Sequence, residues 1–365
     1  MTAASGKHRD MIVHSQDPLN VESPPELLAG SFEIPSEAFY VRNHGTIPDI
    51  SAEEYRLTVS GLVENPLSLS LADLRERFPQ TTVEAALHCA GNRRDELAEV
   101  STVPGELLWG PGAIGNARWN GVRLADLLYA AGVSEEARHA AFAGFDTPYE
   151  GDSQSFGGSI PLHKASSAEV LLAYEMNGEP LPAEHGFPLR VVVPGYVGAR
   201  SVKWLSQITL QSRPSDNYFQ RQSYRLFPPW VGSNGEAADS EAFPLGEISV
   251  NAVICQPSEE ARLPAGEVTV RGVAVAGGGR SVRRVDVTAD GGRSWTGAGL
   301  FEAEFESPWA WRRWEARLSL EPGAHCISAR AVDSAADTQP EDAASLWNIK
   351  GYVNNAWHKT RIQTY

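Results

Sequence analysis

The sequence contains few cysteines, and they are widely spaced. Cys89, Cys255 and Cys326 are the only three among 365 residues. They are too few for a disulfide framework and too far apart for a zinc site built from paired cysteines. We expect Cys255 and Cys326 to be buried thiols within strands, in a protein that occupies a reducing compartment.

Long apolar runs are also missing. No segment approaches the ~18 consecutive apolar residues of a membrane-spanning helix. The first residues contain no apolar region of the kind that a secretory signal needs. We therefore expect a soluble protein without a membrane span, and a cytoplasmic rather than a periplasmic location.

Positive charge is in deficit. The 31 Lys and Arg residues are outnumbered by 46 Asp and Glu residues, which gives a net charge of −15. This balance disfavours nucleic acid or an anionic membrane surface as the main partner. It suits a basic macromolecular partner, and it is equally typical of an acidic soluble protein with no such partner.

The first 235 residues mix strand and helix patterns. Apolar alternation predicts strands at 54–63, 81–91, 170–181 and 187–195. Short helices are predicted at 70–79, where Ser70 and Asp73 form a capping box, and at 121–132, which ends at Gly132. Strands and helices do not alternate regularly, so we predict an α+β domain over 1–235, with an extended N-terminal arm over 1–38.

The character of the chain changes after residue 244. The segment from Pro228 to Pro244 is rich in Gly, Ser, Pro and acidic residues and is the best linker candidate. Residues 245–365 then show short strands separated by turns and no convincing helix, which predicts an immunoglobulin-like β-sandwich. Three tryptophans of this region either anchor a subunit interface or fill its core: Trp309, Trp311 and Trp314.

The segment LHCAGNRRDE, from Leu87 to Glu96, places a cysteine near two cations. Arg93 and Arg94 would stabilise a Cys89 thiolate. One interpretation is an inert buried thiol beside a surface arginine pair. A catalytic nucleophile would need a histidine base, and His88, being adjacent on a strand, points to the opposite face. The remaining interpretation is a soft ligand to a transition metal.

Four segments together resemble the sulfite oxidase family of molybdenum enzymes. They are FYVRNHG (39–45), LHCAGNRR (87–94), HGFPLRVVVPGYVGARSVKW (185–204) and WNIKGYVNNAWH (347–358). The resemblance runs in order over about residues 13–361. It implies a mixed α/β molybdopterin-binding domain followed by a dimerisation domain, and so a homodimer. The arm before Tyr40 leaves no room for the haem domain of animal members, so we expect no haem and the plant-type arrangement.

The resemblance also implies how molybdopterin and molybdenum are bound. Cys89 would be the single protein thiolate on the metal. Arg190 and Lys203 would contact the phosphate of the cofactor, and Asp146 would accept hydrogen bonds from its pterin ring. The matching cofactor-binding positions are Tyr40, Val41, Arg42, Asn43, His44, Asp146, His185, Arg190, Ser201, Val202 and Lys203.

The family's substrate-binding positions fall on Arg42, Arg94, Trp109, Tyr224 and Lys350. Cations would bind the anion, Tyr224 would hydrogen-bond the reacting oxygen, and Trp109 would wall the cavity. The chain departs from the animal pattern at Lys350, where those members carry arginine, and at Pro104, where they carry lysine. Because lysine lacks the planar fork of arginine, we predict weaker anion binding, and a lower KM for sulfite in Lys350→Arg.

The implied reaction converts sulfite and water to sulfate, two protons and two electrons, and the electrons pass to an external acceptor such as a basic cytochrome c or dioxygen. The nearest alternative is a nitrate reductase or another oxyanion oxotransferase on the same scaffold. Methionine sulfoxide reductase subunits lack a β-sandwich, so residues 245–365 speak against them. The remaining alternative is a non-catalytic β-sandwich binding protein.

Overall fold

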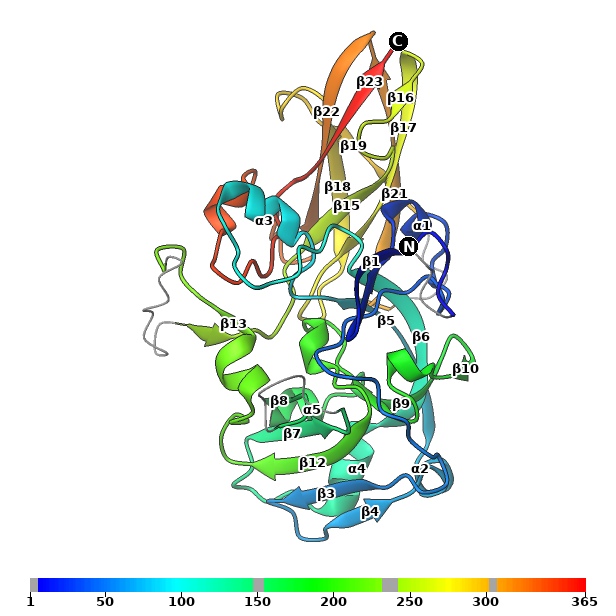
Figure 1. Cartoon of the computed structure of the whole chain (residues 1–365), viewed down its shortest axis with the longest axis vertical. Coiled ribbons are helices and arrows are strands. Elements are labelled where there is room, and N and C mark those ends of the chain that lie inside the picture. Colours follow the sequence, from blue (N-terminus) through cyan, green and yellow to red (C-terminus); the bar gives the residue numbers. More distant parts are fainter. Residues whose placement is uncertain (1–5, 147–153, 232–241, 302–306) are drawn as a thin grey trace.

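The computed structural model describes residues 6–146, 154–231, 242–301 and 307–365. The chain forms two parts that lie one above the other in Figure 1, with the C-terminal sandwich uppermost. Within the described ranges, no helix is long and apolar enough to cross a membrane.

The first sheet of the N-terminal part is antiparallel and carries Cys89 at its edge. Its order is β10 (Glu179–Pro180), β9 (Leu171–Met176), β6 (Ile114–Arg123) and β5 (Gln80–His88), and β11 (Arg190–Val192) also pairs with β9. The turn at Asn177 and Gly178 joins β9 to β10, and both residues have positive φ.

The second sheet is mixed and lies at the bottom of Figure 1. Its order is β4 (Leu67–Leu69), β3 (Leu57–Gly61), β12 (Leu205–Gln211), β7 (His139–Gly144) and β8 (Gly157–Pro161), with β12 parallel to β3. Apolar residues of both sheets, such as Leu172 and Ile208, share one core. This core fixes the two sheets relative to each other.

Short helices join these strands. The predicted helices are confirmed as α2 (Leu71–Arg77), with both hydrogen bonds of its capping box, and α4 (Leu124–Ala131), which ends at left-handed Gly132. The other helical segments are α3 (Arg94–Val100), α5 (Leu162–Ala165), η1 (Ala183–His185), η2 (Gly198–Arg200) and η3 (Phe219–Ser223). A two-stranded ribbon of β13 (Arg225–Leu226) and β14 (Phe243–Pro244) follows.

The N-terminal arm contains regular structure and packs on both parts of the chain. It forms the hairpin of β1 (Ile12–Gln16) and β2 (Leu19–Glu22), then the single turn α1 (Pro25–Leu28), which contacts β15 (Asn251–Gln256) of the C-terminal part. After α1 the chain runs back beside β2, where Val41 forms an antiparallel bridge with Val21. This bridge fixes the segment that leads to His44.

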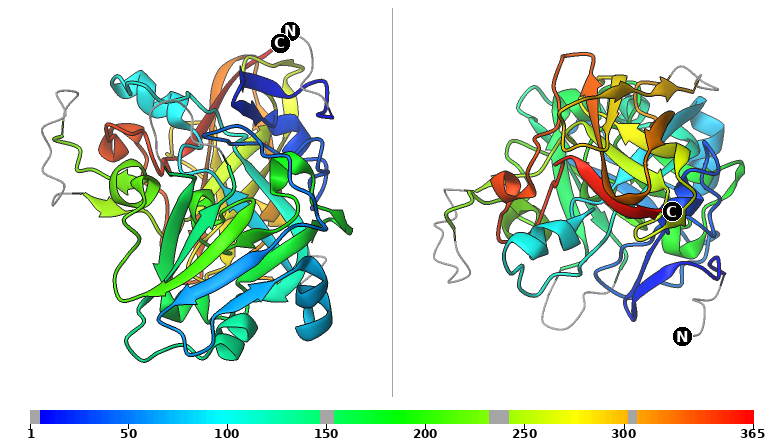
Figure 2. Two further views of the ribbon diagram at one scale, coloured as in Figure 1. Left: turned by 60° about the horizontal axis from the view of Figure 1, so that its bottom comes forward. Right: turned by 90° about the horizontal axis from the view of Figure 1, so that it is seen from above.

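The strands of the C-terminal region form two sheets that face each other as a β-sandwich. One sheet has the order β15 (Asn251–Gln256), β17 (Gly266–Val275), β21 (Arg312–Leu320) and β20 (Gly299–Leu300). The other has the order β16 (Arg262–Leu263), β23 (His358–Thr364), β22 (Gly323–Asp333), β18 (Val282–Thr288) and β19 (Thr296–Gly297). Figure 2 shows these strands end-on in its right-hand view. Inward-facing residues such as Val270 and Ile327 fill the space between the sheets.

The structure can be compared with the predictions for the cysteines and tryptophans of this region. Cys255 is buried in β15, as expected, but Cys326 lies on an outward-facing position of β22 and is exposed, so that prediction was wrong. Trp314 is fully buried in the core of the sandwich, whereas fully buried Trp311 and half-buried Trp309 pack against the apolar cluster that contains Cys89. The predicted linker falls largely on residues 232–241, which lie outside the described residues.

One short segment of the C-terminal region leaves the sandwich and reaches the first sheet. It follows η4 (Ala343–Leu346) and continues to Trp357, directly before β23. Its Val353 amide donates to the carbonyl of Ala90 at 2.7 Å. The C-terminal region therefore contributes backbone and side chains beside Cys89.

Candidate active site

Cys89 directly follows β5 and begins the turn that leads to α3. Its side chain is buried, and its amide donates to the carbonyl of Ala113 at 2.9 Å. Burial raises the pKa of the thiol, and the charges of Arg94 and then Arg42 oppose that rise. The buried thiol thus faces two cations.

The two arginines after Cys89 have different tasks. Arg93 adopts left-handed φ of 61°, and its guanidinium pairs with Glu96 at 2.7 Å and donates to Asn251 of the sandwich. Its charge acts on the neighbouring His88, where it adds to the effect of burial in lowering the pKa to about 4, whereas Arg94 is the cation that most opposes the rise in the pKa of Cys89. Arg94 lies over Gly91, where a Cβ would approach its guanidinium carbon to 2.5 Å. A side chain at position 91 would therefore displace the Arg94 guanidinium.

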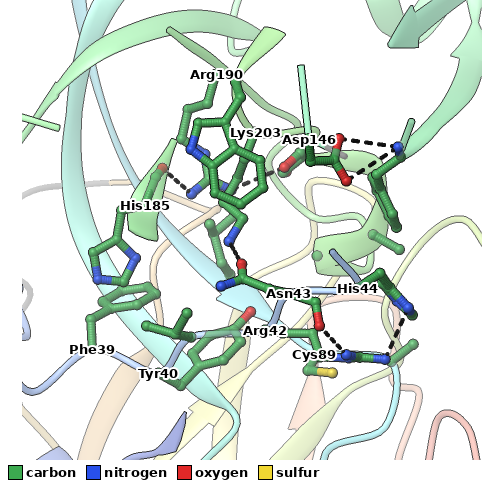
Figure 3. Close-up of a pocket in the computed structure, with 18 of the residues that line it drawn as sticks. Phe39, Tyr40, Arg42, Asn43, His44, Cys89, Asp146, His185, Arg190 and Lys203 are labelled. Carbon is green, nitrogen blue, oxygen red and sulfur yellow. Dashed lines mark hydrogen bonds between the residues drawn. The ribbon is translucent and has the colours of Figure 1, made fainter. Parts of the chain in front are cut away.

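Most of the sequence-predicted site residues line a single pocket (Figure 3). They come from the arm, from the end of β5, and from the loops around β7, β11 and β12. The predicted residues that line it are Tyr40, Val41, Arg42, Asn43, His44, Cys89, Asp146, His185, Arg190, Ser201, Lys203 and Tyr224. Segments far apart in the sequence are thus brought to one place.

One wall of the pocket is the segment from residue 40 to residue 44. The Arg42 guanidinium donates to Asn20 at 3.1 Å and to the carbonyl of Asn43, and it contacts His44 at 3.2 Å. The other ring nitrogen of His44, Nε2, lies 2.7 Å from the Tyr224 hydroxyl. Burial lowers the pKa of His44 well below its usual value, so its ring is neutral at physiological pH.

The opposite wall carries two cations, buried Arg190 and half-buried Lys203. Lys203 donates to the side-chain oxygen of Asn43 and, at 2.8 Å, to the carbonyl of Glu184. Arg190 donates to the carbonyls of His185 and Ser201 at 2.9 and 3.0 Å. Burial lowers the pKa of Lys203 well below its usual value and that of Arg190 to about 10. A bound anion would relieve this burial of charge.

The only carboxylate among the predicted pocket residues is Asp146. Its oxygens accept from the amide of Phe156 at 3.1 and 3.3 Å, and burial raises its pKa. Ser201 uses its hydroxyl to accept from the amide of Val193. Val202 points into the core between the two sheets, and its carbonyl accepts from the amide of Val191, so it supports its neighbours without lining the pocket.

Arg94, Trp109 and Lys350 lie beside this pocket without lining it. Arg94 stacks on the ring of Tyr352 at 5.0 Å, and Tyr352 stacks on Tyr224 at 5.4 Å. Trp109 is fully buried, packs against His14 at 4.6 Å, and its ring N–H has no hydrogen-bond partner. Lys350 donates to Glu106 at 3.2 Å.

Three residues that contact the predicted site residues were not predicted from the sequence. Lys7, Glu106 and Tyr352 all contact predicted site residues. Tyr352 lies in the segment WNIKGYVNNAWH, two residues after Lys350, and Glu106 lies three residues before Trp109, so proximity to these two predicted residues was an available signal. Lys7 is alone in a polar arm, and nothing in its local sequence marks it.

The residues present fit a molybdopterin. Among the described residues, no three His, Cys, Asp or Glu side chains are placed to hold a metal ion. A metal bound by Cys89 would therefore need further ligands, which the dithiolene sulfurs of the cofactor would supply. The side-chain nitrogen of Asn43, Nδ2, is buried and has no hydrogen-bond partner, so it can donate to the cofactor. The cations Arg190 and Lys203 suit the phosphate of the cofactor.

Comparison with known proteins agrees with this site. Residues 44–219 match the oxidoreductase molybdopterin binding domain, and residues 243–365 match the Mo-co oxidoreductase dimerisation domain. The chain is 45% identical to sulfite oxidase of Gallus gallus, over 97% of this chain and 78% of that protein. It is 39% identical to sulfite oxidase of Arabidopsis thaliana, over 98% and 95%. It spans 66% of the Mus musculus mitochondrial sulfite oxidase, at 44% identity.

A solved structure supports the same conclusion. The sulfane dehydrogenase SoxCD from Paracoccus pantotrophus superimposes with a TM-score of 0.81 at 29% identity, covering 97% of this chain and 86% of that one. The matches extend over both parts of the fold, and the protein belongs to the sulfite oxidase family of molybdopterin oxidoreductases.

Proposed function

We propose that this protein oxidises sulfite to sulfate at a molybdenum ion bound by Cys89. The observation that carries the proposal is the buried Cys89 thiol in a pocket rich in cations, in a chain that is 45% identical to a sulfite oxidase. The balanced reaction converts sulfite and water into sulfate, two protons and two electrons.

The chain's residues would hold the cofactor in three ways. Cys89 provides the thiolate ligand. Lys203, Arg190 and His185 receive the phosphate end, with the side-chain amide of Asn43 as a further donor. Asp146 accepts from the pterin ring, Tyr40, Val41 and Ser201 shape the walls around it, and Val202 supports Ser201 and Lys203 from the core. When bound, the molybdenum supplies the two-electron oxidation and the oxygen transfer.

The substrate is a compact dianion, and the protein's task is to position it and offset its charge. Arg42 lines the pocket. Arg94 stacks on Tyr352 and donates to the carbonyl of Lys350, so these two cations lie close to each other beside the pocket. One opposite charge at ~4 Å contributes about 4 kcal/mol at an effective dielectric near 20, before desolvation is subtracted. Trp109, fully buried behind this side, helps to exclude water.

Tyr224 is the candidate hydrogen-bond donor to the reacting oxygen. Burial is the main cause that raises the pKa of its hydroxyl, to about 12. The hydroxyl therefore keeps its proton at physiological pH and can donate it in a hydrogen bond. Neutral His44, 2.7 Å away, fixes the direction of the hydroxyl.

The electrons then pass to an external acceptor, for which we propose a basic cytochrome c. The net charge of −15 would steer a cationic protein toward this enzyme. Dioxygen is the alternative acceptor.

The match of residues 243–365 to a dimerisation domain supports a homodimer. The three cysteines are free, which supports a cytoplasmic location.

The test combines metal analysis with a turnover assay. We expect about one molybdenum per chain and sulfite-dependent reduction of ferricyanide by the purified protein. Molybdenum with nitrate turnover but without sulfite turnover would contradict the proposal. Rates with cytochrome c at rising ionic strength, compared with oxygen uptake, identify the acceptor, because only the charged partner is sensitive to salt.

A further inference from the structure

Glu106 lies between two of the cations that would bind substrate. One carboxylate oxygen is 3.6 Å from Nη1 of Arg94, and the other is 3.2 Å from Nζ of Lys350. The Glu106 and Arg94 side chains are only 14% and 3% exposed, whereas Lys350 is 32% exposed. Glu106 thus forms a partly buried bridge between a helix of the first part and the C-terminal segment.

The position of this bridge relative to Cys89 follows from three contacts. Arg94 lies over Gly91, two residues after the thiol, and stacks on Tyr352. Tyr352 stacks in turn on Tyr224, which lines the pocket. The Glu106 charge also acts on Tyr224, where it adds to the larger effect of burial in raising the hydroxyl pKa. Glu106 is therefore electrostatically close to the site of reaction.

The remaining contacts of Arg94 hold the guanidinium in place independently of Glu106. Its Nε donates to the carbonyls of Lys350 and Gly351 at 3.0 and 3.2 Å, and Nη1 donates to the carbonyl of Leu107 at 2.7 Å. Removing the charge of Glu106 leaves these bonds intact. The Glu106 carboxylate therefore changes the net charge of the site, while the position of the Arg94 guanidinium does not depend on it.

A carboxylate is itself a small oxyanion with the hydrogen-bonding chemistry of sulfite and sulfate. It neutralises one of the two positive charges that Arg94 and Lys350 together bring, so an incoming dianion meets a weaker attraction than two free cations would exert. The same weakening applies to the product, because sulfate carries the same charge as sulfite.

We propose that Glu106 is an internal competing anion that sets how tightly this enzyme binds sulfite and how readily it releases sulfate. This inference rests on the proposed function, because it assigns Arg94 and Lys350 to the substrate. It makes Glu106 a residue that determines affinity and anion selectivity.

The test is Glu106→Gln, which keeps the shape of the side chain and removes its charge. We expect about a 5- to 10-fold lower KM for sulfite, and about the same fall in the inhibition constant of sulfate, equivalent to about 1.0–1.4 kcal/mol. Glu99→Gln on the exposed end of α3 removes the same net charge and serves as the matched control, with both constants unchanged.

Sulfate binding measured by calorimetry provides a readout independent of turnover. If the wild type does not oxidise sulfite, the proposed function fails, while a tighter sulfate Kd in Glu106→Gln still supports the role of Glu106 as a competing anion. Unchanged or weaker sulfate binding in a folded, molybdenum-loaded Glu106→Gln would overturn the inference and leave Glu106 as a structural bridge. If this variant does not fold, Glu106→Ala is measured by the same criteria.

Discussion

The ammonium of Lys7 lies 2.8 Å from Nε2 of His185, although 178 positions separate the two residues in the sequence. The Lys7 side chain is 1% exposed, and it also donates to the carbonyls of Ser36 and Phe39 at 2.6 and 3.1 Å. The same Nε2 also lies 3.2 Å from the carbonyl oxygen of Ser36, and Lys7 pairs with Glu184 at 3.2 Å. The N-terminal arm thereby holds an ammonium against the ring of a pocket histidine.

Lys7→Met is expected to weaken retention of the cofactor. Without the ammonium, the ring of His185 loses the donor that orients it, and we expect cofactor release about 3- to 10-fold faster. The measurement is molybdenum content and pterin fluorescence after timed dialysis. Arg9→Met removes a cation from the same arm, where the side chain is 87% exposed, and should release cofactor at the wild-type rate. Equal release from Lys7→Met would show that the contact does not support the pocket.

Tyr224→Phe is expected to lower kcat/KM for sulfite by about 10- to 100-fold, because it removes the hydroxyl that lies 2.7 Å from His44. The pKa of Tyr224 is raised to about 12 and that of His44 lies well below its usual value. Neither group titrates between pH 6 and 9. Wild type and variant should therefore have pH–rate profiles of the same shape, and a break that disappears only in Tyr224→Phe would contradict this assignment.

Asp95 should make the protein less stable as pH rises toward neutrality. Burial, followed by the charges of Glu96 and Glu22, raises the pKa of its carboxyl to about 7. The folded state then binds a proton that the unfolded state has already lost above about pH 4. The unfolding free energy contributed by this group therefore falls between about pH 4 and pH 7.

Asp95→Asn should remove this loss, since the amide cannot ionise and its oxygen can still accept from the backbone of Glu96. We expect a gain of about 1–2 kcal/mol over wild type at pH 8 and little difference at pH 4, measured by denaturant unfolding. Asp49→Asn on an exposed loop is the control. A variant that is less stable than wild type at pH 8 would contradict the argument.

The local structure was largely readable from the sequence because its signals are local. The Ser70 capping box, the Gly132 helix end and the alternation before Cys89 all depend on neighbours a few residues apart. The same holds for the change to short strands after residue 244. Recognition of the motifs then identified the residues that gather around Cys89.

What the sequence did not reveal depends on contacts between distant segments. Lys7 meets His185 because the arm folds back along the first part, and no local pattern encodes that path. Cys326 obeys the strand alternation but lies on the outward face, which alternation alone cannot distinguish from the inward one. The opposite orientations of Arg93 and Arg94 follow from one left-handed residue, since φ of Arg93 is 61°.

The most direct test of the account is sulfite turnover in Cys89→Ser. Serine keeps the size of the side chain but replaces the soft thiolate with a hydroxyl that is a poor ligand for such a metal. With Cys326→Ser as the control for an exposed thiol, we measure sulfite-dependent ferricyanide reduction per chain. If Cys89 binds the molybdenum, Cys89→Ser alone loses activity by at least about 1,000-fold; a rate equal to wild type would contradict this assignment.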